Sequence, residues 1–392
     1  TSVSWYRDNH ILSAVESQQF FVDGSLDFRF NSAVFFQDHI RLELAYEAVG
    51  AGGQTRKAVT KLSPGSGYEQ FFQNSRVPSD DRQLFDLTGT LSEGKEYAAY
   101  HRIDRLYLAL DGGYGTIKAG RQPLTWGNGQ VFNPADLVNP FAPADIIRDY
   151  KVGTDMLLYQ TGGERVSDFQ LVYVPRWSVE DGKLDGAEST YGGKVRISRN
   201  EVDIDLLLLR NYEDPVVGGG LTGFLGSALY RTDWTLTFLA DDPERNQYIS
   251  IVANVDYSWV LKDKNLYGFI ELYYNGLGAD SPLEALQDEA LAARLQRGEV
   301  FVTGKYYLDA MVQYEAHPLT NMFLSVIVNL QDLSFLLQPR LVWEMTDSSQ
   351  VLTGFNLPVG GRGDEFGEGE YMETGSSTGQ AIQAYAVVTW YF

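Results

Sequence analysis

The chain has 392 residues, of which 44% are hydrophobic, and a formal net charge of -21. This length allows two or three soluble domains or one large barrel. No stretch approaches the roughly 20 consecutive apolar residues of a membrane helix. The acidity argues against a nucleic-acid partner, whose phosphates need Lys and Arg. The 24 Tyr, 21 Phe and 7 Trp are a high aromatic content, typical of the girdles at the membrane interfaces of β-barrels.

The first residues of the chain are the least informative. The sequence begins at Thr1 without a Met and without a signal peptide, so we interpret it as a mature form whose leader has been removed. Residues 1–18 are predicted to be a partial first strand, a periplasmic extension or a short plug. The absence of Cys is compatible with an oxidising envelope without requiring one.

From Val22 to Asn31, apolar and polar residues alternate. Successive side chains of a β-strand point to opposite faces, so one face of this strand is apolar and the other is charged. The same alternation returns in Ile40 to Glu47, after a turn near residues 36–39. It recurs too often along the chain for one soluble sandwich. We therefore expect an all-β fold with a continuous apolar face.

Long and short connections alternate along the chain, as they do in outer-membrane barrels, where the extracellular loops are long and the periplasmic turns short. Residues 50–100 and 127–152 are the long polar connections. Short turns are predicted at 199–202, 231–233, 261–265, 316–320 and 346–349. Further strands are predicted at 101–111, 116–126, 154–160, 169–177, 191–199, 202–212, 221–230, 234–239, 248–259, 266–275, 306–314, 322–329, 333–343 and 351–356. With one strand inside residues 1–18, the pattern predicts a single transmembrane antiparallel β-barrel domain over 1–392, of about 18 strands, or about 16 if some segments are divided too finely.

One insertion, within the long connection 277–304, is predicted to be a short helix. Ser281, Pro282 and Glu284 stand at the N-cap, N1 and N3 positions and form a capping box. Gly298 supplies the stop. The topology places this connection outside the membrane, so the helix is expected to pack over or into the mouth of the barrel.

The mixed face of the strands is assigned to the barrel interior, because an Arg or Lys that faces lipid at the bilayer midplane costs roughly 2–4 kcal/mol. Most of these inward charges are expected only to be solvated or to brace the interior. The candidates to line the lumen or a constriction are Arg41, Glu43, Arg105, Lys118, Arg121, Arg196, Glu271, Asp309 and Arg340. Lys118 and Arg121 have opposite parity, so we predict either a bulge at Gly120 or a position for Arg121 at the rim.

The segment Gly120–Pro143, GRQPLTWGNGQVFNPADLVNPFAP, is the most distinctive of the chain. Its two Asn-Pro pairs are turn initiators that keep it out of helix and sheet. The segment resembles one found in several families of proteobacterial outer-membrane channels, including porin-like and alginate-export-type barrels. This resemblance implies a passage for solutes or for a polymer. The loop either packs on the rim or folds inward as a constriction that carries Asp136, Asp145, Arg148, Asp149 and Lys151.

The last strand lies within Gly379–Phe392, where alternate residues from Ile382 to Phe392 are all apolar. Alternating hydrophobic residues before a terminal Phe resemble the closing strand of Gram-negative outer-membrane barrels. This resemblance implies an outer-membrane location, contact with lipid and lipopolysaccharide through residues such as Trp390 and Phe392, and recognition of the strand by the barrel-assembly machinery. We expect it to pair with the strand inside residues 1–18 or, failing that, with Val22–Asn31.

The favoured function is a porin-like channel for small hydrophilic solutes, and the acidity favours cations. The alternative is a specialised export or partner-gated conduit for a polymer, a lipid or a periplasmic protein, and a homo-oligomer is also open. The four His are scattered without metal-ligand spacing, and no Ser–His–Asp arrangement stands out. We therefore predict no enzyme activity, no cofactor and no metal site.

Overall fold

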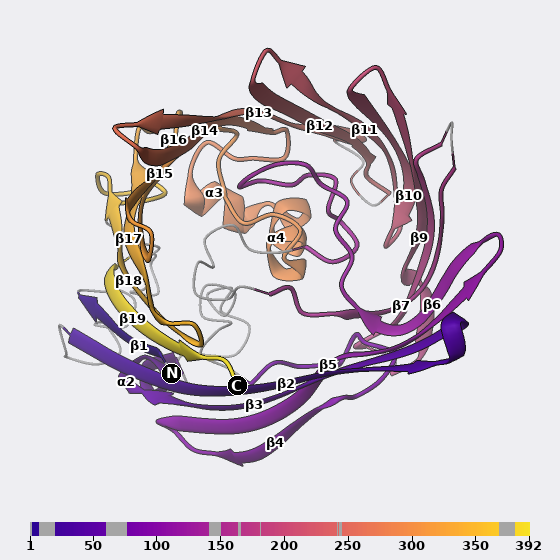
Figure 1. Ribbon diagram of the computed structural model, residues 1–392, viewed down its shortest axis with the longest axis horizontal. Helices are drawn as coiled ribbons and strands as arrows, with labels where there is room; N and C mark the ends of the chain where they lie inside the picture. Colours follow the sequence, from indigo (N-terminus) through magenta and orange to yellow (C-terminus); the bar gives the residue numbers. More distant parts are fainter. Residues whose placement is uncertain are drawn as a thin grey trace.

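The computed structural model describes residues 2–7, 20–59, 77–140, 150–163, 166–180, 182–240, 242, 245–367 and 381–392, with the backbone alone at 2–7, 20, 58 and 59. Within these ranges the chain is one antiparallel sheet rolled into a barrel, whose wall contains 18 strands (Figure 1). The predicted all-β barrel and its strand number are thereby confirmed. None of the described helices has the length and apolar character needed to cross a membrane.

The strands follow one another round the wall in chain order, each antiparallel to the next. Their bounds are β1 (Ser2–Arg7), β2 (Phe20–Phe36), β3 (Ile40–Gly53), β5 (Tyr97–Gly112), β6 (Gly115–Gln122), β7 (Thr154–Thr161), β8 (Asp168–Trp177), β9 (Leu184–Arg199), β10 (Val202–Asn211), β11 (Asp214–Leu225), β12 (Ala228–Phe238), β13 (Gln247–Leu261), β14 (Lys264–Asn275), β15 (Tyr306–His317), β16 (Thr320–Asn329), β17 (Phe335–Thr346), β18 (Ser349–Val359) and β19 (Ile382–Trp390).

The alternation expected from the sequence separates the two faces of the wall. In β13, Ile249, Ile251 and Val255 face outward and are 36%, 37% and 42% exposed. Val252 and Asn254 face inward and are 0% and 6% exposed. An apolar outer face suits the hydrocarbon of a bilayer, and inward residues can be polar because they meet water or other protein groups.

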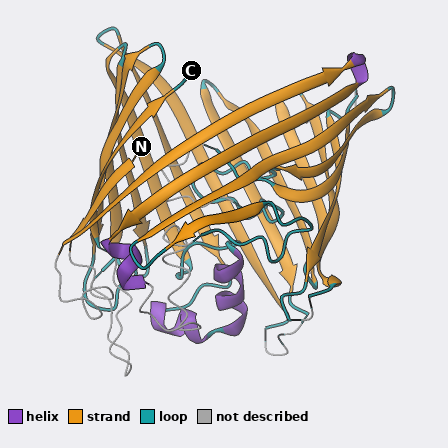
Figure 2. Ribbon diagram, turned by 90° about the horizontal axis from the view of Figure 1, so that it is seen from below, coloured by secondary structure: helices purple, strands orange, loops and turns teal. Residues whose placement is uncertain are grey.

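The turns at one end of the barrel are short, and the longest connections lie at the other end, where residues 212–213 nevertheless form a two-residue turn. Asn200 and Glu201 form one two-residue turn and Lys262 and Asp263 another, with φ of 51°, 64°, 50° and 62°. Such turns have the twist that the flanking antiparallel strands require. Figure 2 shows the larger helices and long connections at the end opposite the C-terminus. In outer-membrane barrels the long loops are extracellular.

The hairpin turn predicted at residues 231–233 is wrong. The turn lies at residues 226–227, between β11 and β12, and Gly226 has a φ of 64°. Arg231 and Asp233 instead lie within β12, in register with β11. Their side chains face the polar interior, so a strand can carry them without interruption.

β1 joins the two ends of the sheet, as predicted for a strand within residues 1–18. It pairs with β2 on one edge and β19 on the other, and Ser2 lies opposite both Ser25 and Val387. These pairings cover residues 2–7, so the part of β2 beyond Ser25 has no partner strand on this edge within the described residues. In that part the rings of Phe28 and Phe392 stack, with their centroids 6.0 Å apart.

The connection 50–100 contains secondary structure that the sequence pattern does not predict. It holds α2 (Gln54–Val59) and β4 (Thr88–Glu93). β4 pairs with residues 98–102 of β5, whereas β6 pairs with residues 106–112 of the same strand. β4 therefore belongs to the same sheet and extends it along the part of β5 that β6 does not reach (Figure 1).

The predicted loop helix is present, but it is divided into two. α3 (Pro282–Gln287) follows Ser281, whose hydroxyl accepts a hydrogen bond from the Glu284 N–H at 3.3 Å. α4 (Glu289–Arg297) follows a second cap, Asp288, which accepts from the Leu291 N–H at 3.0 Å. Each cap satisfies an N–H that the first turn leaves unpaired. The extended backbone of Asp288 ends the first helix where the sequence pattern suggested continuity.

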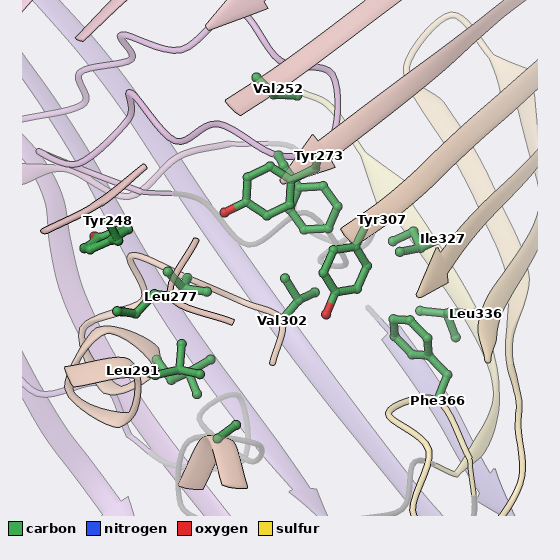
Figure 3. Close-up of a cluster of buried hydrophobic side chains, with 14 residues drawn as sticks. Tyr248, Val252, Tyr273, Leu277, Leu291, Val302, Tyr307, Ile327, Leu336 and Phe366 are labelled. Atoms are coloured by element: carbon green, nitrogen blue, oxygen red, sulfur yellow. The ribbon is translucent and has the colours of Figure 1, made fainter. Parts of the chain in front are cut away.

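A buried apolar cluster occupies the long-loop end of the barrel. Figure 1 shows α3 and α4 within the outline of the wall, and Figure 2 shows the helices at that end. Leu291 of α4 and Val302 of the following segment belong to the same cluster as Tyr248, Tyr273 and Tyr307 of the inner wall (Figure 3). Burial of these apolar side chains holds the helices in the mouth. It contributes roughly 25 cal/mol of stabilising free energy for each Å² of apolar surface removed from water.

Candidate functional site

The connection between β6 and β7 folds into the barrel. Its residues 123–140, here called the inward loop, run along the inner wall (Figure 1). Leu124, Trp126 and Leu137 of the loop pack with inward residues such as Leu158 and Leu207. Of the two positions that the sequence left open, the described part of the loop therefore takes the inward one.

Two carboxylates of the wall hold Asn128 of the inward loop. The Asn128 N–H donates to Asp233 Oδ2 at 2.5 Å, and its Nδ2 donates to Asp233 Oδ1 at 2.7 Å and to Asp205 Oδ2 at 2.9 Å. Its Oδ1 accepts from Arg196 Nη2 at 2.9 Å. Asp205 and Asp233 flank Gly220 in register, and a Cβ on Gly220 would lie 2.1 Å from Asp233 Oδ1. The glycine therefore leaves the room that this arrangement needs.

Glu271 of β14 forms a second attachment point for the inward loop. Its side chain is fully buried. One carboxylate oxygen accepts the N–H of Val131 at 3.0 Å and of Phe132 at 2.8 Å. The other oxygen accepts the Gln130 N–H at 2.6 Å and Asn254 Nδ2 at 3.0 Å. Hydrogen bonds to a charged group contribute about 1.5–3 kcal/mol each, so Glu271 fixes this part of the loop firmly.

The sequence of the inward loop gives it the bend that reaches Glu271. A Cβ on Gly129 would lie 1.8 Å from the carbonyl oxygen of Phe132, so only glycine fits there. The bend brings the Phe132 ring onto Tyr273, with centroids 4.4 Å apart. Asp136 forms an ion pair with Lys151 at 2.5 Å. Burial raises the pKa of Asp136, although Lys151 acts in the opposite direction.

The connection returns to a different part of the wall. Tyr150 donates its hydroxyl to Glu47 of β3, and the Arg29 guanidinium of β2 lies 3.4 Å from the centre of the Tyr150 ring. Arg102 of β5 also forms an ion pair with Glu47. The connection is thus tied to β14 near residue 131 and to β2 and β3 at Tyr150.

Several predicted lumen residues lie on the inner face of the wall. Arg41 Nε is 3.3 Å from Glu43 Oε1, and Arg196 is 2.6 Å from Asp205. Arg105 and Lys118 lie on the inner faces of β5 and β6. No ion pair of theirs is found within the described residues.

Two further candidates have unpaired polar atoms. Asp309 is the register partner of Glu271 on β15. It is fully buried, and neither carboxylate oxygen has a hydrogen-bond partner within the described part of the chain. Arg340 of β17 lies over the Phe323 ring, 4.3 Å from its centre. Asp145, Arg148 and Asp149 lie outside the described residues.

Arg121 does not line the lumen. It is opposite Leu106 and Asp155 in a continuous register, without a bulge at Gly120. It therefore lies at the rim end of β6 on the outward side, 2.9 Å from Asp155 and 3.0 Å from Asp80. The segment that contains Asp80 covers it, which is why an outward Arg can be buried there.

Glu271 and Arg196, which hold the inward loop, are among the predicted lumen residues, whereas Asp205 and Asp233 are not. Asp205 faces inward because Ile204 and Leu206 face outward, so its parity marks it as a lumen residue. Asp233 falls in the wrongly predicted turn, which hides its parity. Nothing in the sequence pairs either residue with Asn128, because that contact depends on the path of the loop.

No family model and no curated protein matches the chain. Solved structures share its fold over 100% of its length. One of them is Wzi, an Escherichia coli outer-membrane protein described as a carbohydrate-binding β-barrel involved in group 1 capsule assembly. The match covers 84% of the Wzi chain, with a TM-score of 0.52 and 9% sequence identity. Another is Acinetobacter baumannii OccAB1, of which the match covers 95%, with a TM-score of 0.52 and 9% identity. A third is Pseudomonas aeruginosa OccK5 (OpdH), of which the match covers 97%, with a TM-score of 0.53 and 8% identity. These proteins are Gram-negative outer-membrane β-barrels, and the chain has the fold of that group.

Proposed function

We propose that the chain is an outer-membrane channel that passes small hydrophilic solutes through the part of the lumen beside the inward loop. The attachment of this loop to Asp205, Asp233 and Glu271 carries the proposal. A loop fixed in this way narrows a polar lumen to a defined width. The fold shared with OccAB1 and OccK5 supports a channel.

The outer face of the barrel supports the proposed membrane location. Its outward Val, Leu, Ile and Phe residues would contact lipid chains, and Trp390 and Phe392 of the closing strand would lie at the membrane boundary. Contact with lipopolysaccharide, recognition by the barrel-assembly machinery and a homo-oligomer are further parts of the proposal. Heat-dependent migration on detergent gels tests the barrel in solution, because folded barrels run differently before and after boiling.

Single-channel recording in planar bilayers tests the proposed channel. We expect discrete current steps in KCl from the purified wild-type protein. Swelling of liposomes in sugars of increasing size should then show a sharp size limit, because the inward loop is fixed. Correctly folded protein that inserts but never conducts would contradict the proposal.

The ion preference is a separate prediction. The net charge of -21 favours cations, but several inward carboxylates already bind the loop or an Arg, among them Asp205 and Glu271. The reversal potential in a KCl gradient measures the preference. Clear anion selectivity would mean that the unpaired inward cations outweigh the acidic loops.

One observation favours a second candidate, a conduit that opens only with a partner. The apolar cluster around Leu291 and Tyr273 fills part of the mouth. A partner that displaces α3 and α4 would then be needed for passage of a polymer, a lipid or a periplasmic protein. Silence of the wild-type protein in bilayers, with large conductance after deletion of residues 282–297, would favour this candidate.

A further inference from the structure

Most inward arginines of the wall are paired with a carboxylate. Arg41 is 3.3 Å from Glu43, and Arg196 is 2.6 Å from Asp205. Arg340 of β17 has no such partner within the described ranges. Its Nε is buried and makes no hydrogen bond there. The Phe323 ring covers the guanidinium, 4.3 Å away, and leaves the hydrogen-bonding edge of the group for another partner.

A second unpaired donor lies in the same row of the inner wall. Arg340, Gly354 and Tyr385 are register partners across β17, β18 and β19. Tyr385 is 3% exposed, and its hydroxyl has no hydrogen-bond partner within the described residues. Buried hydroxyls in folded proteins are normally paired, so this one calls for an explanation.

Gly354 lies between Arg340 and Tyr385 in this row and leaves room for the Tyr385 side chain. A Cβ on Gly354 would lie 2.6 Å from the Tyr385 hydroxyl oxygen, so the hydroxyl lies directly over the glycine. The Arg340 guanidinium and the Tyr385 phenol thus each have a donor that is unpaired within the described part of the chain, and they lie on either side of a glycine in one inward row.

A chain of amides lies next to this row. Gln338 Nε2 donates to Asn356 Oδ1 at 2.9 Å, and Asn356 Nδ2 donates to Gln383 Oε1 at 2.7 Å. The chain leaves one acceptor on Gln338 and one donor on Gln383 for further partners. Amide groups of this kind suit the hydroxyls of a solute whose charged end is held elsewhere.

We infer that Arg340 and Tyr385 form a binding subsite for the carboxylate of a small hydroxylated solute. Arg presents parallel N–H donors that match the two oxygens of a carboxylate. The Tyr385 hydroxyl donates a third hydrogen bond, and the amides from Gln338 to Gln383 bind the hydroxyls. This subsite rests on the proposed channel and gives it a substrate class.

Calorimetry on the detergent-solubilised protein tests the subsite, with gluconate as the probe and glucose as its uncharged counterpart. We expect gluconate to bind and glucose to bind at least about tenfold more weakly. Arg340→Gln and Tyr385→Phe should each weaken gluconate binding about tenfold, the size of one lost hydrogen bond to a charged group. Tyr385→Phe removes only an unpaired hydroxyl, so its heat-dependent gel migration should match the wild type.

Arg231→Gln is the matched control, because it removes an inward charge that is already paired with Asp256. It should leave gluconate binding unchanged. Equal binding of gluconate to the wild type and to both subsite variants would overturn the subsite. Equally tight binding of inorganic phosphate would overturn its assignment to carboxylates. A conducting channel that does not bind gluconate contradicts only the subsite, and binding without conductance contradicts only the channel.

Discussion

Replacing Glu271 by Gln should release the inward loop from β14. The substitution keeps the size of the side chain but exchanges one carboxylate oxygen for an NH₂ group, which cannot accept a hydrogen bond. Each carboxylate oxygen of Glu271 accepts two hydrogen bonds. Oε2 accepts from the Gln130 N–H and from Asn254 Nδ2. Oε1 accepts from the N–H groups of Val131 and Phe132. Two of these four hydrogen bonds are lost whichever way the amide turns.

The size of the effect follows from those two hydrogen bonds. Each contributes about 1.5–3 kcal/mol with a charged acceptor, so the attachment weakens by about 3–6 kcal/mol. A change of about 3 kcal/mol alters an equilibrium by roughly a hundredfold. The Asn128 contacts remain, so the loop should open locally at its tip while the barrel stays folded.

Hydrogen exchange and conductance measure this release. In Glu271→Gln, the amides of residues 130–132 should exchange at least about a hundredfold faster, and the single-channel conductance should rise. Glu315→Gln is the control, because it makes the same change of charge at a carboxylate that binds Asn265 near a short turn. Wild-type exchange and wild-type conductance in Glu271→Gln would refute the idea that Glu271 holds the loop.

Three further predictions concern other parts of the chain. Gly129→Ala places a Cβ 1.8 Å from the Phe132 carbonyl oxygen, so the loop amides should lose protection from exchange while the barrel still shifts on detergent gels. Burial raises the pKa of Asp288, but its hydrogen bonds from Arg245 and from a helix N–H outweigh this, so the pKa lies below its usual value. This cap therefore stabilises α4 fully above about pH 4 and is lost as the pH falls further. Asp288→Asn should speed exchange in α4 at pH 7, with a difference from the wild type that disappears in strong acid; a constant difference would contradict the assignment. Deletion of Phe392 removes its ring contact with Phe28 at the seam. A smaller fraction of the variant than of the wild type should therefore assemble into the heat-modifiable form, and an equal fraction would show that the contact is dispensable.

The barrel could be predicted because the membrane acts on every strand in the same way. The outward residues of segments such as Val22–Asn31 must be apolar, and the repeated alternation then gives the strand number. The turn at residues 226–227 was missed because Arg231 and Asp233 are polar for a different reason, their inward position. The strand β4 was missed because its six residues, TGTLSE, contain one large apolar side chain and show no alternating pattern.

The candidate site could be predicted only in part. Parity places Glu271 and Arg196 on the inner face, but it does not reveal that both serve the inward loop. That requires the path of the loop, which depends on Gly129 and on the space over Gly220. Of the two positions predicted for Arg121, the structure has the one at the rim, and the lumen position is wrong. The pattern could not decide between them, because the partner of Arg121, Asp80, lies 41 residues earlier in the chain.

Single-channel recording of the purified wild-type protein is the most direct test of the proposed channel. We expect discrete, reproducible current steps in KCl, with no other protein present. Membranes that stay silent, although heat-modifiable protein has inserted into them, would contradict it.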